Sequence, residues 1–228
     1  MASKNVSDNA RVSGNAQVWG NARVRDNAQV SGDARVSDNA RAWGDALVSD
    51  NARVSGNAQV SGDARVWDNA QVSGDALVSD NARVSGYALV SDNARVSGNA
   101  QVWGNARVWD NARVSGNAQV SGDARVWDNA QVSDNARVSG NAQVSGDARV
   151  FGDADISSVR DWFLFTYEGQ TLTGYRSRNA DGYELNIDGR SITKDQIESI
   201  ALLFYLNELI GKFTPFTVSA KSLKSLIS

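Results

Sequence analysis

A six-residue repeat from Val6 to Ile156 constrains the fold more than any other feature of the chain. Every sixth residue in this stretch is valine, except Ala42 and the closing Ile156, and every hexad has alanine at its fifth position. The consensus unit is Val-Ser/Trp-Gly/Asp-Asn/Asp-Ala-Arg/Gln. Because self-similarity at a short fixed period is the signature of a repeat architecture, we expect a solenoid.

Each hexad is expected to form a short strand followed by a corner. Alanine and the next valine are two residues apart, so on a strand both side chains face the same side. The Arg or Gln between them faces outward, and so does the Ser or Trp after valine. The next two positions hold Gly or Asp and then Asn or Asp, residues that tolerate the backbone conformations of a tight corner. A helix would need apolar spacings of three and four, which the repeat lacks.

Three hexads make a triangular coil of eighteen residues, the geometry of a left-handed parallel β-helix. An aliphatic residue at the first position and a small one at the fifth resemble the hexapeptide-repeat superfamily, whose members form such prisms. The resemblance implies an all-β solenoid over residues 1–156, with three hexads per coil and about eight coils from 25 hexads. Asn and Asp side chains at the corners are expected to hydrogen-bond from coil to coil.

Residues 157–228 leave the repeat and are expected to form a small α+β module. Turn-forming residues separate three β-prone runs, which predicts strands at Trp162–Tyr167, Gln170–Ser177 and Gly182–Ile187. A helix is expected over about 194–210, with a capping box before it and glycine after it, and a short final helix over 218–227.

The module is expected to cap one end of the solenoid and to join copies of the chain. Its order of elements resembles the C-terminal tail of uncharacterised hexapeptide-repeat proteins encoded by phages and prophages. The longer helix is apolar on nearly every face, so one face is left for another partner after the strands are covered. We therefore expect homo-oligomerisation through Ile200, Leu203, Phe204, Leu206 and Ile210.

Composition excludes several kinds of chemistry. The chain contains neither histidine nor cysteine, which removes the commonest general base, thiolate metal sites and disulfides. Many hexapeptide-repeat proteins are acyltransferases that use a histidine base and a loop protruding from the prism. This chain has no histidine and no insertion between Val6 and Ile156. We therefore expect a protein that is not an enzyme and has no catalytic residues, cofactor or metal site.

Charge and hydropathy also bear on partners and location. The formal net charge of −3 argues against nucleic acid as a partner and against mimicry of it. No apolar run is long enough to span a bilayer, and the first residues contain no apolar signal segment. We therefore expect an intracellular protein with no membrane contact, and the resemblance to phage and prophage proteins implies the cytoplasm of a bacterial host cell.

Six tryptophans occupy the outward position after valine. Exposed tryptophan is uncommon outside interfaces, so these residues predict contact with a protein partner. The alternative is that the rings pack on one another across neighbouring coils. The predicted partner-binding residues are Trp103, Trp109, Trp127, Arg107 and Arg125.

Thirteen arginines occupy the outward position before valine. They could form a ladder for phosphate groups, but the region also contains eighteen aspartates, so pairing between the two is the favoured interpretation. A second candidate anion site is expected on one strand of the C-terminal module, where two arginines alternate with polar residues. It consists of Arg176, Arg178, Tyr175 and Tyr183, and the alternative there is a solvated strand face.

Residues 54–73 recur identically at 114–133. The offset of sixty is a multiple of six but not of eighteen, so the copy falls on a different face of the prism. This shift favours a spacer or generic surface over a site confined to one face.

The favoured function is a non-enzymatic binding or scaffold protein, including the case of a phage-encoded inhibitor of a host protein. Alternatives are a small-ligand protein for phosphate or nucleotide, a nucleic-acid binder or mimic, and a degenerate acyltransferase. Ice binding would need a regular threonine array, which the repeat does not contain.

Overall fold

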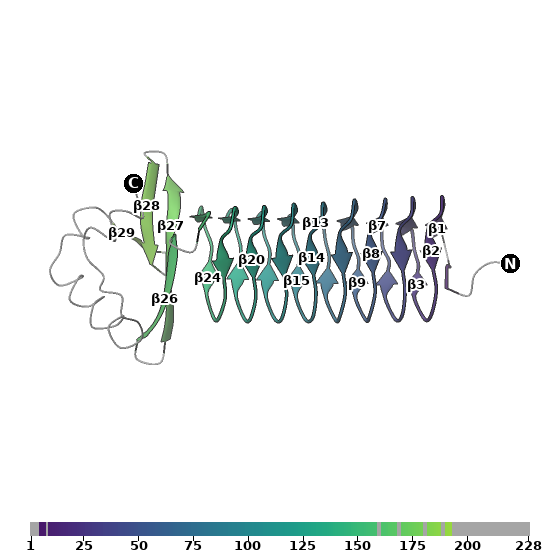
Figure 1. Cartoon of the computed structure of the whole chain (residues 1–228), viewed down its shortest axis with the longest axis horizontal. Helices are drawn as coiled ribbons and strands as arrows, with labels where there is room; N and C mark the ends of the chain where they lie inside the picture. Colours follow the sequence, from purple (N-terminus) through teal and green to yellow (C-terminus); the bar gives the residue numbers. More distant parts are fainter. Residues whose placement is uncertain are drawn as a thin grey trace.

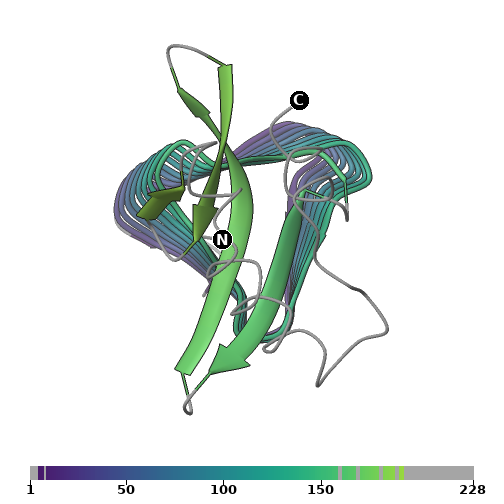
Figure 2. The same ribbon diagram turned by 90° about the vertical axis from the view of Figure 1, so that its left-hand side faces the viewer.

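The computed structural model describes residues 5–7, 9–158, 161–167, 170–179, 182–187 and 190–192. Its described part is a parallel β-solenoid followed by a small antiparallel sheet (Figure 1). Three sheets form the sides of a left-handed triangular prism, which is visible end-on in Figure 2. The predicted solenoid is confirmed.

The hexads form 25 two-residue strands, and each strand pairs in parallel with the strand eighteen residues away. The first sheet contains β1 (Arg11–Val12), β4 (Gln29–Val30), β7 (Leu47–Val48), β10 (Arg65–Val66), β13 (Arg83–Val84), β16 (Gln101–Val102), β19 (Gln119–Val120), β22 (Arg137–Val138) and β25 (Asp155–Ile156). The second contains β2 (Gln17–Val18), β5 (Arg35–Val36), β8 (Arg53–Val54), β11 (Gln71–Val72), β14 (Leu89–Val90), β17 (Arg107–Val108), β20 (Arg125–Val126) and β23 (Gln143–Val144). The third contains β3 (Arg23–Val24), β6 (Arg41–Ala42), β9 (Gln59–Val60), β12 (Leu77–Val78), β15 (Arg95–Val96), β18 (Arg113–Val114), β21 (Gln131–Val132) and β24 (Arg149–Val150).

The interior of the prism consists of the repeated alanines and valines. From Ala22 to Val150 all of these side chains are fully buried, and Ala42 is buried in a valine column. A column of identical side chains packs because the eighteen-residue register places each residue directly over its equivalent in the next coil. At the N-terminal end the interior is less covered, and Val12 is 37% exposed.

The corners are held by two coil-to-coil ladders. Gly or Asp at the third position has φ between 57° and 72°, and most of these aspartates accept a hydrogen bond from the next coil, such as Gly44 N–H to Asp26 Oδ2 at 3.0 Å. This bond offsets the strain of a left-handed conformation at a residue with a Cβ. At the fourth position Asn side chains donate to the next coil, as Asn27 does to Asp45 at 3.0 Å. The predicted corner ladders are therefore present.

The C-terminal sheet has the strand order β26 (Trp162–Tyr167), β27 (Gln170–Asn179), β28 (Gly182–Ile187) and β29 (Arg190–Ile192). Two of the three predicted strands have the expected bounds, whereas β27 continues to Asn179 because it pairs with β28 as far as Gly182. Strand β29 was not predicted, and it pairs antiparallel with β28. The helices predicted over 194–210 and 218–227 lie outside the described residues.

The antiparallel sheet lies across the C-terminal end of the prism (Figures 1 and 2). Tyr175 of β27 is fully buried in the same core as the last coils, with its ring edge-on to Phe151 at 5.8 Å. Arg149 N–H donates to Thr173 Oγ1 at 2.8 Å, and Trp162 Nε1–H donates to the Gln143 carbonyl at 2.6 Å. An open strand edge and an exposed core are thereby covered at this end. No helix among the described residues is long and apolar enough to cross a membrane.

Candidate binding surface

The side of the prism formed by the second sheet brings together four of the five predicted partner-binding residues. Arg107 in β17 pairs in register with Arg125 in β20, and each is followed two residues later by a tryptophan. The Trp109 and Trp127 rings stack with their centroids 5.1 Å apart and their planes 4° apart. Two arginines and two tryptophans thus lie at equivalent positions of two successive coils, and we call these four residues the Arg–Trp cluster.

The backbone explains why the two rings meet. Trp109 N–H donates to the Val126 carbonyl and Trp127 N–H to the Val144 carbonyl, both at 3.0 Å, so the two residues leave the sheet in the same direction. Neighbouring strands lie about 4.8 Å apart, which sets the ring separation. Offset-stacked aromatic pairs contribute about 0.5–1.5 kcal/mol beyond the area that they bury. Both rings are half-buried, so part of their surface is accessible to a partner.

Arg107 and Arg125 are exposed like charges on adjacent strands, an arrangement that destabilises a sheet when nothing neutralises it. No arginine on the prism faces forms an ion pair with a carboxylate in the part of the chain that the structure describes. The favoured pairing of these arginines with the aspartates is therefore not seen. The reason is that corner carboxylates take part in the coil-to-coil ladders, as Asp123 does by accepting from Asn105 Nδ2 at 2.9 Å.

Trp103 is placed differently from the other predicted residues. It directly follows β16 of the first sheet, at the start of the corner that leads to β17. The Arg–Trp cluster lies beyond the other end of that corner. Trp67 occupies the equivalent position two coils earlier, with Ser85 between them, so these two rings do not stack as Trp109 and Trp127 do. Trp19 is 43% exposed, and its neighbour on the next coil is Ser37.

Tyr175 is a correction to the predicted anion site. Its side chain is fully buried at the end of the prism, because the open core there needs a large apolar ring to cover it. The backbone pairs Arg178 with Tyr183 and Arg176 with Leu185 across the β27–β28 hairpin. The side chains of Arg176, Arg178 and Tyr183 lie outside the described part, and so do the predicted oligomerisation residues Ile200, Leu203, Phe204, Leu206 and Ile210.

One group that the sequence did not single out is Asp161, in the connection between prism and module. Burial raises the pKa of this carboxyl, but hydrogen bonds from Ser157 N–H at 2.8 Å, Ser157 Oγ at 2.9 Å and Ser158 N–H at 2.7 Å outweigh it. The pKa of Asp161 therefore lies below its usual value of 3.8. This carboxylate fixes the turn that leads into β26. The described residues contain no group of three or more acidic, histidine or cysteine side chains able to hold a metal ion.

The comparisons with known proteins agree with the geometry of the prism. The family model described as "YdcK Beta solenoid repeat" matches residues 6–19, 16–32, 28–42, 46–60, 58–74, 70–86, 88–104, 106–122, 130–143 and 142–157, more than half of the chain. The chain belongs to the YdcK β-solenoid repeat family. The resemblance to hexapeptide-repeat proteins is confirmed. No curated protein matches the sequence.

Solved structures similar to this chain include hexapeptide-repeat enzymes. A hexapeptide transferase family protein from Anaplasma phagocytophilum is 20% identical, with 57% of this chain and 74% of that chain covered and a TM-score of 0.35. The UDP-N-acetylglucosamine acyltransferase of Francisella novicida is 13% identical, with coverages of 74% and 69% and a TM-score of 0.37. That of Campylobacter jejuni is 12% identical, with coverages of 89% and 82% and a TM-score of 0.33.

Proposed function

We propose that this YdcK-type solenoid is a non-enzymatic binding and scaffold protein that holds a protein partner on the Arg–Trp cluster. The observation that carries the proposal is the stacked Trp109–Trp127 pair beside the Arg107–Arg125 pair. Tryptophan and arginine are the residue types that dominate binding energy at protein interfaces. The prism fixes the backbone spacing of all four residues, and stacking orders the two tryptophan rings before binding, which lowers the entropy lost on association.

The chemistry of the cluster defines the partner. Two adjacent guanidinium groups favour a carboxylate that can accept from both, and the accessible tryptophan surface favours an apolar or aromatic side chain next to it. The partner surface therefore carries Asp or Glu beside a large apolar residue. The closed Trp–Trp stack leaves no gap for a nucleobase between the rings, which supports a protein rather than a nucleotide. In line with the resemblance to phage and prophage proteins, the proposed partner is a host protein in the bacterial cytoplasm that the solenoid inhibits.

The absence of histidine from the sequence supports a role without acyl transfer. Purified protein is expected to show no turnover of acetyl-coenzyme A with amine or hydroxyl acceptors. Turnover that co-purifies with the chain and is lost on a mutation in the prism would establish a degenerate acyltransferase instead.

The sequence itself supplies a matched control for the binding test. Trp67 and Trp127 sit in identical twenty-residue segments, but only Trp127 has a tryptophan eighteen residues away. Serine is the commonest residue at this position of the repeat, so Trp→Ser is compatible with the fold. Tagged W109S/W127S, W43S/W67S and wild-type chains are compared by quantitative pull-down from bacterial lysate. We expect a protein retained by the wild type and by W43S/W67S to be lost from W109S/W127S. Equal retention by all three would refute the assignment of the cluster.

A further inference from the structure

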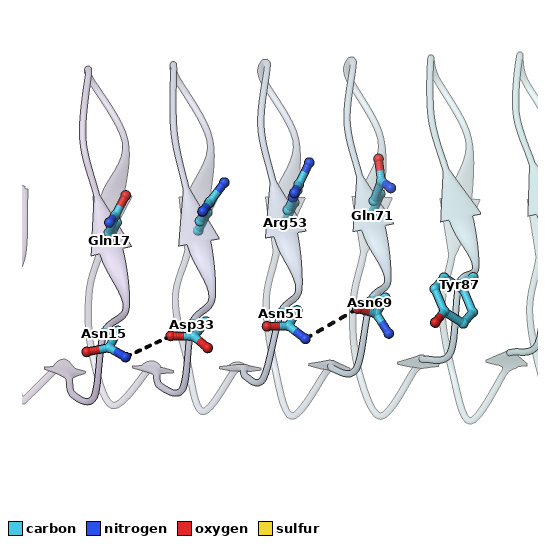
Figure 3. A pocket seen from close by; sticks show the side chains of 9 residues that line it. Asn15, Gln17, Asp33, Asn51, Arg53, Asn69, Gln71 and Tyr87 are labelled. Carbon is cyan, nitrogen blue, oxygen red and sulfur yellow. Dashed lines mark hydrogen bonds between the residues drawn. The ribbon is translucent and has the colours of Figure 1, made fainter.

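A second surface feature lies on the same side of the prism, closer to the N-terminus. A shallow groove of about 450 Å³ runs along the prism axis between a corner column and the outward residues of β2, β5, β8 and β11 (Figure 3). Tyr87 stands at one end of it, and Asn15 lies at the other. The groove crosses five successive coils, so its polar groups repeat at about 4.8 Å.

Tyr87 is an exception to the corner pattern. All other fourth positions of the hexads hold Asn or Asp, whereas this one holds a tyrosine that is 68% exposed. The corner backbone is unchanged, since Gly86 has φ 68° and Tyr87 N–H donates to the Gly104 carbonyl at 2.8 Å. The side chain gives no coil-to-coil amide bond, and no described residue accepts from Nδ2 of the adjacent Asn69. The tyrosine therefore interrupts the ladder, as aspartate does at other fourth positions, but it alone adds an exposed aromatic ring that a ligand can contact.

The charges in the groove restrict its ligand. Arg35 and Arg53 pair in register on β5 and β8, so their guanidinium groups can grip one carboxylate together. Asp33 lies in the same groove, accepts from Asn15 Nδ2 at 2.9 Å and keeps capacity to accept from a ligand hydroxyl. A carboxylate in this place repels a ligand that is negative along its whole length, such as single-stranded nucleic acid. Neutral amides, including Gln71 and Asn69, complete the row.

We propose that this groove binds a segment of an acidic oligosaccharide. Sugar hydroxyls match the repeating amide and carboxylate groups, a uronate carboxylate matches the Arg35–Arg53 pair, and the Tyr87 ring offers a flat face for the C–H side of a terminal sugar. The coil spacing is close to the length of one sugar residue in an extended chain. An extended peptide would need pockets for alternate side chains, and the described lining has no apolar group beyond Tyr87.

The test uses the full-length chain and isothermal titration calorimetry with a hyaluronan hexasaccharide, in which glucuronate residues alternate with neutral N-acetylglucosamine. Y87N restores the asparagine of the other corners, and R53Q places the glutamine found at neighbouring strand positions, so both variants preserve the repeat. Each is expected to weaken binding about tenfold, the effect of one lost contact to a charged group or ring. Thermal unfolding of Y87N at or above the wild-type temperature would show that the loss does not come from misfolding.

R41Q is the matched control, because Arg41 belongs to β6 of another sheet in register with Gln59. Binding by R41Q and by W109S/W127S is expected to stay at the wild-type level, which separates this site from the proposed protein interface. The proposal is overturned if the hexasaccharide does not bind saturably or binds Y87N and R53Q like the wild type. It is also overturned if an oligoglutamate peptide or single-stranded DNA binds the groove as tightly as the sugar.

Discussion

Replacing Ala42 by valine is expected to stabilise the protein. Ala42 is the one alanine in a column of buried valines, with Val24 and Val60 as its register partners in the adjacent coils. Valine adds two carbons to a fully buried site, and at about 0.8 kcal/mol per buried methylene the gain is about 1.5 kcal/mol. For a chain of this size this corresponds to about 3–6 °C in the unfolding temperature.

The same substitution two residues earlier should have the opposite sign. Ala40 is fully buried in the alanine column, where the next coil also offers only an alanine. A valine there overpacks the interior and is expected to destabilise by about 1–3 kcal/mol. Thermal and urea unfolding of A42V and A40V, followed by circular dichroism, measures both. If A42V lowered the midpoint, or if both variants shifted in one direction, the assignment of separate valine and alanine columns would be refuted.

Four further predictions concern the stacked rings, the corners, the connection and the assembly. W127S should unfold about 0.5–1.5 kcal/mol more readily than W67S in urea, because only Trp127 loses a stacked partner; equal midpoints would contradict the stacking. G74A should be more destabilising than G152A by thermal unfolding. Both glycines have positive φ, but a Cβ at position 74 would lie 2.7 Å from the Asp92 nitrogen, whereas a Cβ at position 152 would meet no atom within 4 Å. The reverse order of stability would exclude close packing at the corner. The lowered pKa of Asp161 contributes stability that is present above the pKa of the unfolded chain, near 4, and is lost as pH falls through the folded value. D161N should therefore be less stable at pH 7 and show a smaller loss between pH 5 and 2 in acid titrations, and a parallel loss in both chains would argue against this role. Light scattering of the purified protein should give a multiple of 24.4 kDa, and a single-chain mass would contradict the predicted homo-oligomer.

The repeat predicts the prism because every hexad contains the residues that determine its own strand and its own corner. Ala-x-Val specifies a strand with one inward face, Gly or Asp followed by Asn or Asp specifies a corner, and the period alone places equivalents over one another. The C-terminal module has no such redundancy. Its fourth strand, Arg190–Ile192, is three residues long and exists only because β28 offers a free edge. The burial of Tyr175 likewise depends on where the module meets the last coil.

The Arg–Trp cluster could be predicted in part. The period of eighteen places Arg107, Arg125, Trp109 and Trp127 on one side, which a count along the chain can find. The twenty-residue copy at an offset of sixty favoured a surface without a preferred side, but the second sheet contains both the Arg–Trp cluster and the Tyr87 groove. The count cannot show that the rings stack at 5.1 Å or that the arginines form no ion pair with a described carboxylate, since both depend on side-chain directions. Tyr87 is the single residue at the fourth position of the hexads that is neither Asn nor Asp. This exception is the sequence feature from which the groove could have been predicted.

The most direct test of a protein partner on the Arg–Trp cluster is site-specific photo-cross-linking in bacterial cells. A photoreactive phenylalanine analogue is placed at position 109 in one chain and at position 67 in another. We expect a discrete cross-linked partner protein from position 109 that is absent from position 67 and lost when Arg107 and Arg125 are changed to glutamine. Identical cross-links from both positions, or none from position 109, would contradict it.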